Sequence, residues 1–196
     1  MRKQNIIFVV AFFCLTLNLK AQFTHEDTLR GSITKERAWW DLVHYDLKVK
    51  VDPKDKSFSG TNTVTYRVLK PASILQIDLQ TPMVISKVTQ DGVSLDFTRD
   101  GNVWYIQVQK PQNINDINQL IITYGGKVHQ AKNAPWYGGV VWSKDANGKD
   151  FIATACQGIG ASIWYPCKDH TYDEPDSMRI TITAPDHLFG VSNGRM

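Results

Sequence analysis

A two-residue alternation of apolar and polar side chains begins after His44, and it restricts the fold more than any other feature of the chain. The apolar members of the first run are Tyr45, Leu47, Val49 and Val51. A second run repeats the pattern with Val64, Tyr66 and Val68. Because successive side chains of a strand point to opposite faces of a sheet, both runs predict half-buried β-strands.

Shorter extended segments follow, and no segment shows sustained helical periodicity. Three turn signals separate several of them, namely Asp91-Gly92, Asp100-Gly101 and Asn147-Gly148; glycine tolerates the positive φ that tight hairpin turns require. The predicted short strands are 74–79, 84–89, 93–97, 103–108, 120–124, 140–142, 151–154 and 179–183. We therefore predict an all-β fold over residues 39–196, built as an antiparallel multi-stranded sandwich or as curved sheets. The polar, aperiodic segment 22–38 is predicted to be a flexible lead-in.

The first 21 residues have the organisation of a secretory leader. Arg2 and Lys3 give a basic start, an apolar run extends from Ile6 to Leu17, and Ala21 offers a small residue for cleavage. The run is shorter than the roughly 20 apolar residues that span a bilayer. We predict a signal peptide over 1–21 and an exported protein, periplasmic or secreted. An uncleaved membrane anchor is the alternative.

Removal of the leader would leave a chain without net charge. Three of the 22 basic residues, Arg2, Lys3 and Lys20, leave with it, and the remaining 19 balance the 19 acidic residues. This composition gives no basic patch for nucleic acid and no polybasic helix for an anionic membrane surface. Cys156 and Cys167 remain, either as buried thiols or as a disulfide that an exported protein could hold.

The segment Thr154–Met178, TACQGIGASIWYPCKDHTYDEPDSM, is the candidate functional region. Gly158, Gly160, Pro166 and Pro175 interrupt it, so it can be neither one helix nor one strand. Its aromatic residues argue against disorder. A long irregular segment inside a compact domain is typical of a functional loop.

This segment resembles the end of the amino-terminal domain of the M1 family of zinc aminopeptidases. The similarity rests on Pro166-Cys167-Lys168-Asp169 and on Asp173-Glu174-Pro175, which are separated here by three further residues. Three other blocks occur in the family's order: Trp40–Leu47 with His44-Tyr45, Ser59-Gly60-Thr61 through Tyr66, and Val191-Ser192-Asn193-Gly194. Together they cover residues 39–196 and imply the β fold of that domain.

The resemblance also implies a zinc-dependent hydrolase whose metal is held by a helix with a His-Glu-x-x-His motif. None of the five histidines starts this motif; His25 precedes Glu26, but Leu29 occupies the second histidine position. We therefore expect no catalytic residue, metal ligand or cofactor in this chain, and we expect the chain to be inactive alone. Zinc is implied for a full-length member whose catalytic domain is absent here.

Gln157 is the candidate substrate-binding residue. In the family, the matching Gln or Glu reaches into the active site and helps to hold the free amino group of the peptide, and an amide carbonyl can accept a hydrogen bond from an ammonium group. Many members carry a second Gln two residues earlier, where this chain has Ala155. The alternative is that Gln157 only bonds the backbone of its loop. The implied partner is a peptide with a free amino terminus, bound together with the missing domain.

Two further groups of residues could form either a ligand-binding site or an ordinary structural feature. Carboxylates and an imidazole lie close in sequence at Asp169, His170, Asp173 and Glu174; we favour turn capping and pairing with cations over a metal site. Exposed tryptophans could bind carbohydrate, but we favour core or interdomain packing for Trp39, Trp40, Trp136 and Trp142.

The sequence thus predicts the amino-terminal β domain of an exported M1-like zinc aminopeptidase, which covers the active site and offers Gln157 to the substrate amine. The rival hypothesis is a free-standing secreted β-sandwich module that binds protein or glycan and has no catalytic activity.

Overall fold

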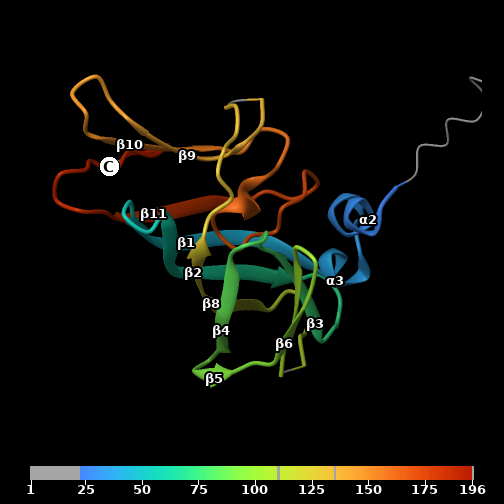
Figure 1. Cartoon of the computed structure of the whole chain (residues 1–196). Coiled ribbons are helices and arrows are strands. Elements are labelled where there is room, and N and C mark those ends of the chain that lie inside the picture. Colours follow the sequence, from blue (N-terminus) through green and yellow to red (C-terminus); the bar gives the residue numbers. More distant parts are fainter. Residues whose placement is uncertain (1–22, 110, 135, 196) are drawn as a thin grey trace, which may run out of the picture.

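The computed structural model describes residues 23–109, 111–134 and 136–195, and eleven strands dominate this part of the chain (Figure 1). The leader proposed for residues 1–21 lies outside the described residues. The strands are β1 (Trp40–Asp52), β2 (Ser57–Val68), β3 (Ile74–Asp78), β4 (Val84–Gln90), β5 (Val93–Ser94), β6 (Phe97–Asp100), β7 (Val103–Gln107), β8 (Ile117–Lys127), β9 (Gly139–Lys144), β10 (Asp150–Ala155) and β11 (Ser177–Thr183). The helical elements are α2 (His25–Gly31), α3 (Lys35–Ala38) and a 3₁₀ turn, η1 (Ala161–Ile163).

The strands form three sheets. The largest has six strands in the order β11-β1-β2-β8-β4-β5, a second has the order β3-β7-β6, and β9 pairs with β10 as a hairpin. In Figure 1 the hairpin lies at the top of the view and the three-stranded sheet at the lower right. The predicted all-β class with several antiparallel sheets is confirmed.

The alternating pattern places the core as predicted. On β1 the side chains of Tyr45, Leu47 and Val49 are buried, whereas Lys48 and Lys50 are exposed. The buried face of β2 carries Val64, Tyr66 and Val68. One core runs beneath all three sheets, so the domain has a single hydrophobic interior.

Two strands depart from the expected arrangement. The segment 93–97, predicted as one strand, is divided between β5 and β6, which belong to different sheets; Leu95 lies buried where the chain crosses between them. The other departure is β11, which pairs with β1 in parallel. A parallel neighbour requires a long connection, and here residues 53–176, which contain β2 to β10, form it.

The predicted flexible lead-in instead forms the two short helices α2 and α3. Thr24 and Asp27 make a reciprocal capping box at the start of α2. The side chain of Arg37 is fully buried, and it donates hydrogen bonds to the carbonyl oxygens of Leu29 (2.9 Å) and Ser32 (2.8 Å). Capping and a buried cation hold this segment in place, and neither produces the hydrophobic periodicity by which helices are found in a sequence.

Among the residues described, no helix has the length and apolar character needed to cross a membrane.

Candidate functional site

Gln157 lies on a tight turn that follows β10. The carbonyl oxygen of Cys156 accepts hydrogen bonds from the backbone amides of Ile159 (3.2 Å) and Gly160 (2.9 Å). Gly158 has φ +76° and Gly160 has φ +84°, a region that side-chain-bearing residues rarely adopt. The side chain of Gln157 is exposed, and within the described residues its amide makes no hydrogen bond. The bond to loop backbone considered for it is therefore not found there.

Long side chains from distant elements hold this turn. The amide nitrogen of Gln80 donates to the carbonyl oxygen of Ile159 at 2.6 Å, and a guanidinium nitrogen of Arg30 donates to that of Gly158 at 3.0 Å. Both contacts are made to the backbone, so they fix the course of the turn. The amide of Gln157 is left facing solvent, and the backbone of the two residues that follow it is anchored.

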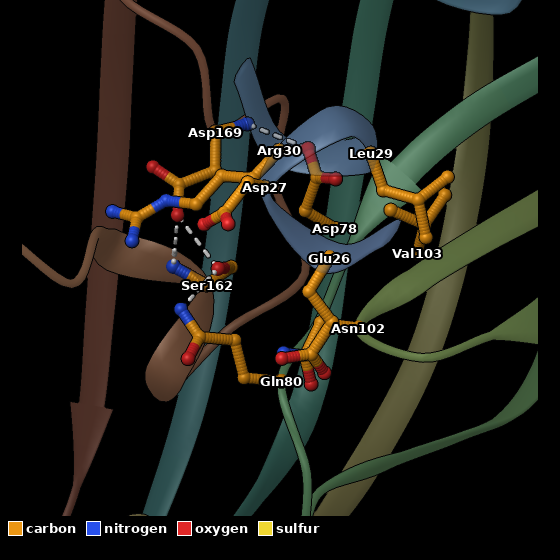
Figure 2. Close-up of a pocket in the computed structure, with 10 residues that line it drawn as sticks. All are labelled: Glu26, Asp27, Leu29, Arg30, Asp78, Gln80, Asn102, Val103, Ser162 and Asp169. Atoms are coloured by element: carbon orange, nitrogen blue, oxygen red, sulfur yellow. Dashed lines mark hydrogen bonds between the residues drawn. The ribbon is translucent and has the colours of Figure 1, made fainter. Parts of the chain in front are cut away.

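Asp169 holds the segment that directly follows this turn, through contacts with Ser162 and Asp78 (Figure 2). Its carboxylate accepts hydrogen bonds from the amide nitrogen of Ser162 (3.3 Å) and from the Ser162 hydroxyl (2.6 Å), and its own amide donates to Asp78 Oδ2 at 3.0 Å. The carboxylate lies directly over Gly160, where a Cβ would come within 1.9 Å of Asp169 Oδ2. This contact explains why glycine occupies position 160.

Asp78 connects this network to the helical segment. Its Oδ1 accepts a hydrogen bond of 2.7 Å from Arg37, and both side chains are almost fully buried. Burial raises the pKa of the Asp78 carboxyl, while the Arg37 guanidinium and the Asp169 amide oppose that rise. A buried ion pair of this kind fixes the position of a loop, because loss of either partner would leave an uncompensated charge.

Lys168 forms a second buried anchor. Its ammonium group donates to the carbonyl oxygen of Trp40 (2.6 Å) and to Asp173 Oδ2, and it lies 3.9 Å from the centroid of the Trp40 ring. Asp173 Oδ2 also accepts from the backbone amide of Leu42 at 3.2 Å. Burial lowers the pKa of Lys168, and the hydrogen bond with Asp173 opposes this change.

These contacts settle the roles of two of the clustered acids. Asp169 caps the turn at Ser162, and Asp173 pairs with Lys168, as favoured from the sequence. Glu174 is exposed, and His170 contacts the carbonyl oxygen of Gly31 at 3.2 Å. Within the described part of the chain, no three or more His, Cys, Asp or Glu side chains are placed to hold a metal ion.

A groove of about 820 Å³ runs beside the anchored turn. Its walls come from α2, from β1 and from the loop between residues 156 and 175; Cys156 and Gly158, the neighbours of Gln157, lie on its lining. A smaller pocket of about 210 Å³ lies between α2 and the Asp169 network (Figure 2). Gln157 is thus at the edge of the larger groove.

Both cysteines of this region are free thiols in the structure. Cys167 is buried in the core and Cys156 is half-buried, and burial raises the pKa of each thiol. Both thiols are therefore protonated at neutral pH, and they react poorly because the thiolate is the nucleophilic form.

The tryptophans singled out in the sequence divide into two groups. Trp39 and Trp40 are buried and make edge-to-face contacts with Tyr66, which confirms core packing for this pair. Trp142 is half-buried and packs edge-to-face against Phe58. Trp136 is not in the core: 76% of its surface is exposed.

The sequence did not single out three of the residues that position the site: Arg37, Asp78 and Lys168. Lys168 lies inside the motif that carried the resemblance, so its position was a usable signal. Arg37 and Asp78 are 41 residues apart in the chain, and only the packing of α3 against β3 brings them together.

Fold and site together define an all-β domain in which the amide of Gln157 lies on a turn with an anchored backbone, at the edge of a groove. The model of the Peptidase M1 N-terminal domain matches residues 42–196. The chain belongs to this family.

Relatives of known name agree with the match. Aminopeptidase N of Lactobacillus delbrueckii subsp. lactis is 28% identical over 136 residues, which are 68% of this chain and 15% of that protein. A mutant of a two-domain M1 zinc metallopeptidase bound to L-arginine superposes with a TM-score of 0.62 at 22% identity, over 81% of this chain and 37% of that one. Yeast LTA4 hydrolase in complex with bestatin gives a TM-score of 0.61 at 18% identity, over 84% and 27%. At these identities the structural likeness concerns the fold.

Proposed function

We propose that this domain is the amino-terminal part of an exported zinc aminopeptidase, in which it covers the active site and contacts the free amino group of the peptide through Gln157. The chain spans 15% of the aminopeptidase N that it matches and 37% of the two-domain metallopeptidase. The activity proposed here is therefore that of a longer protein.

The exposed, unpaired amide of Gln157 is the observation that carries the proposal. An amide carbonyl held on an anchored turn can accept a hydrogen bond from an ammonium group without prior reorganisation. That contact would select peptides with a free amino terminus and align the first peptide bond for attack. The L-arginine bound to the two-domain metallopeptidase supports an amino acid or peptide as the ligand.

Zinc, when bound in such an enzyme, polarises a water molecule for attack on the peptide carbonyl. A zinc site of this kind requires three protein ligands, and residues 23–109, 111–134 and 136–195 hold no such set. We assign the metal to the catalytic domain of the longer protein. The role of this chain is limited to binding and orienting the peptide.

The coding sequence beyond Met196 tests the first half of the proposal. A continuous reading frame with a His-Glu-x-x-His motif and a downstream Glu supports the aminopeptidase. A stop codon followed by unrelated sequence contradicts it and supports the secreted binding module. Export is tested by amino-terminal sequencing of protein from the cell envelope or medium, where we expect a mature chain that starts near Gln22.

Kinetics of the longer enzyme test the role of Gln157. Loss of a hydrogen bond to a charged group costs about 1.5–3 kcal/mol, so Gln157→Ala should lower kcat/KM on a free-amine substrate roughly ten- to hundredfold. Asn147→Ala is the matched control, because Asn147 is an exposed amide residue at the opposite end of the β9–β10 hairpin. Wild-type kinetics in a folded Gln157→Ala enzyme would remove this residue from the site.

A further inference from the structure

An exposed aromatic pair precedes β9. Trp136 is 76% exposed and Tyr137 is 67% exposed, whereas the other five tryptophans of the chain are buried or half-buried. Two adjacent aromatic side chains in water contribute little to the core. Large exposed apolar surface of this kind marks sites where a ligand or partner binds.

The backbone fixes the position of this pair. The amide of Tyr137 donates to the carbonyl oxygen of Asn133 at 2.8 Å. Gly139 has φ +139°, and a Cβ there would lie 2.5 Å from the amide nitrogen of Ala131. The loop is thus pinned immediately after the aromatic pair.

The same loop lies against the chain that leads to Gln157. A Cβ at Gly138 would come within 2.4 Å of the Ala155 carbonyl oxygen and within 2.7 Å of the Ile159 side chain. Gly139 pairs with Ala155 at one end of the β9–β10 ladder. Trp136 and Tyr137, which precede β9, therefore lie at the same end of the hairpin as Gln157, which follows β10. In Figure 1 the yellow segment before β9 and the orange segment after β10 lie side by side at this end.

We propose that Trp136 and Tyr137 form a wall of the subsite for the first side chain of the peptide, beside the amide of Gln157, and that they favour a bulky apolar residue there. The inference rests on the proposed function, because it needs Gln157 to hold the amino group of the same residue. The ammonium group and the side chain of a first residue leave the same Cα, so groups that bind them must be neighbours. Aromatic rings bury a large apolar area with few rotatable bonds.

Peptide titration of the longer protein, treated with a chelator so that the peptides are not hydrolysed, tests this inference. The probes are Phe-Ala-Ala, Gly-Ala-Ala and N-acetyl-Phe-Ala-Ala, and the readout is the ¹⁵N-indole signal of Trp136, assigned with a Trp136→Phe variant. We expect Phe-Ala-Ala to shift this signal and Gly-Ala-Ala to bind about tenfold more weakly, since it lacks the ring that would stack on the pair. Trp136→Ala lacks this indole, so its affinities are measured by calorimetry; it should bind the Phe and Gly peptides alike and still prefer a free amine.

Phe151→Ala is the matched control. Phe151 is also an exposed aromatic residue of this hairpin, but it lies near the turn that joins β9 to β10, away from Gln157. The control should keep the preference for the Phe peptide. Equal affinity of the Phe and Gly peptides for the wild-type longer protein, or no response of the Trp136 indole to any peptide, overturns the inference.

Two further outcomes separate this inference from the role of Gln157. A preference for Phe over Gly that persists while acetylation has no effect would show an aromatic contact without the amine contact, and would overturn the assignment of the pair to the subsite of the first residue. In the longer protein, acrylamide should quench the fluorescence of Trp136 unless peptide is bound. Protection of Trp136 without peptide would assign the pair to domain packing and overturn the inference.

Discussion

The carboxylate of Asp169 occupies the space that a side chain at Gly160 would need, because a Cβ at position 160 would lie 1.9 Å from Asp169 Oδ2. The Asp169 carboxylate also accepts two hydrogen bonds from Ser162, and it would lose both if it moved away from Gly160. The turn that bears Gln157 is therefore fixed by a contact between two residues of the motif-containing segment.

Gly160→Ala should destabilise the domain. The added methyl group must displace Asp169, and alanine is strained at φ +84°, so we expect a loss of about 1–3 kcal/mol in the free energy of unfolding. Gly158→Ala is the control: its φ is +76°, but a Cβ there meets nothing within 4 Å, so only the strain of about 1 kcal/mol applies. Urea unfolding of both variants measures the difference. Equal losses would show that the Asp169 contact contributes nothing.

Lys168→Met should lower the free energy of unfolding more than Gly160→Ala does, although methionine is a side chain suited to the core. It leaves the Asp173 carboxylate nearly buried without its cation, which typically costs about 3–5 kcal/mol. The double variant Lys168→Met with Asp173→Asn should recover part of that loss, because the uncompensated charge is removed. Urea unfolding of the two single variants and the double variant gives the coupling. Additive losses would contradict a direct interaction between the two side chains.

The sequence predicted the strand framework well because one physical pattern, the two-residue alternation, specifies it locally. It did not predict the placement of Arg37, since a buried cation within a polar segment gives no periodic signal. The parallel pairing of β11 with β1 also depends on a long connection rather than on the strand itself. At the site, glycines located the turn of Gln157, but the anchors Gln80 and Arg30 come from elements remote in the chain.

Tyr66 should make the stability of the domain sensitive to high pH. Burial raises the pKa of its phenol from 10.0 to about 12. Because the folded-state pKa lies above the unfolded value, the stability contributed by the neutral phenol is fully present below pH 10. It is lost as the pH rises towards 12, by up to about 2–3 kcal/mol.

Comparison with Tyr66→Phe isolates this effect. The variant lacks the hydrogen bond of 2.9 Å from the phenol to Gln112, so it should be less stable than the wild type at pH 8. Its stability should fall less steeply between pH 10 and 12, because it has no phenol to ionise at this position. Urea unfolding followed by tryptophan fluorescence at pH 8, 10, 11 and 12 measures both slopes. Parallel curves would contradict the assignment to Tyr66.

Gln157→Ala should leave the stability of this chain within about 0.5 kcal/mol of the wild type, as is usual for an exposed side chain without structural contacts. The amide is exposed and has no hydrogen bond within the described residues, and the turn is held through the backbone contacts of Gln80 and Arg30. Gln80→Ala is the informative comparison, because it removes the 2.6 Å hydrogen bond to Ile159 and should destabilise the domain by about 1 kcal/mol or more. Thermal and urea unfolding of both variants measures the two effects. A large loss of stability in Gln157→Ala would mean that the Gln157 amide supports the loop. It would contradict the proposal that this amide serves only to bind the substrate.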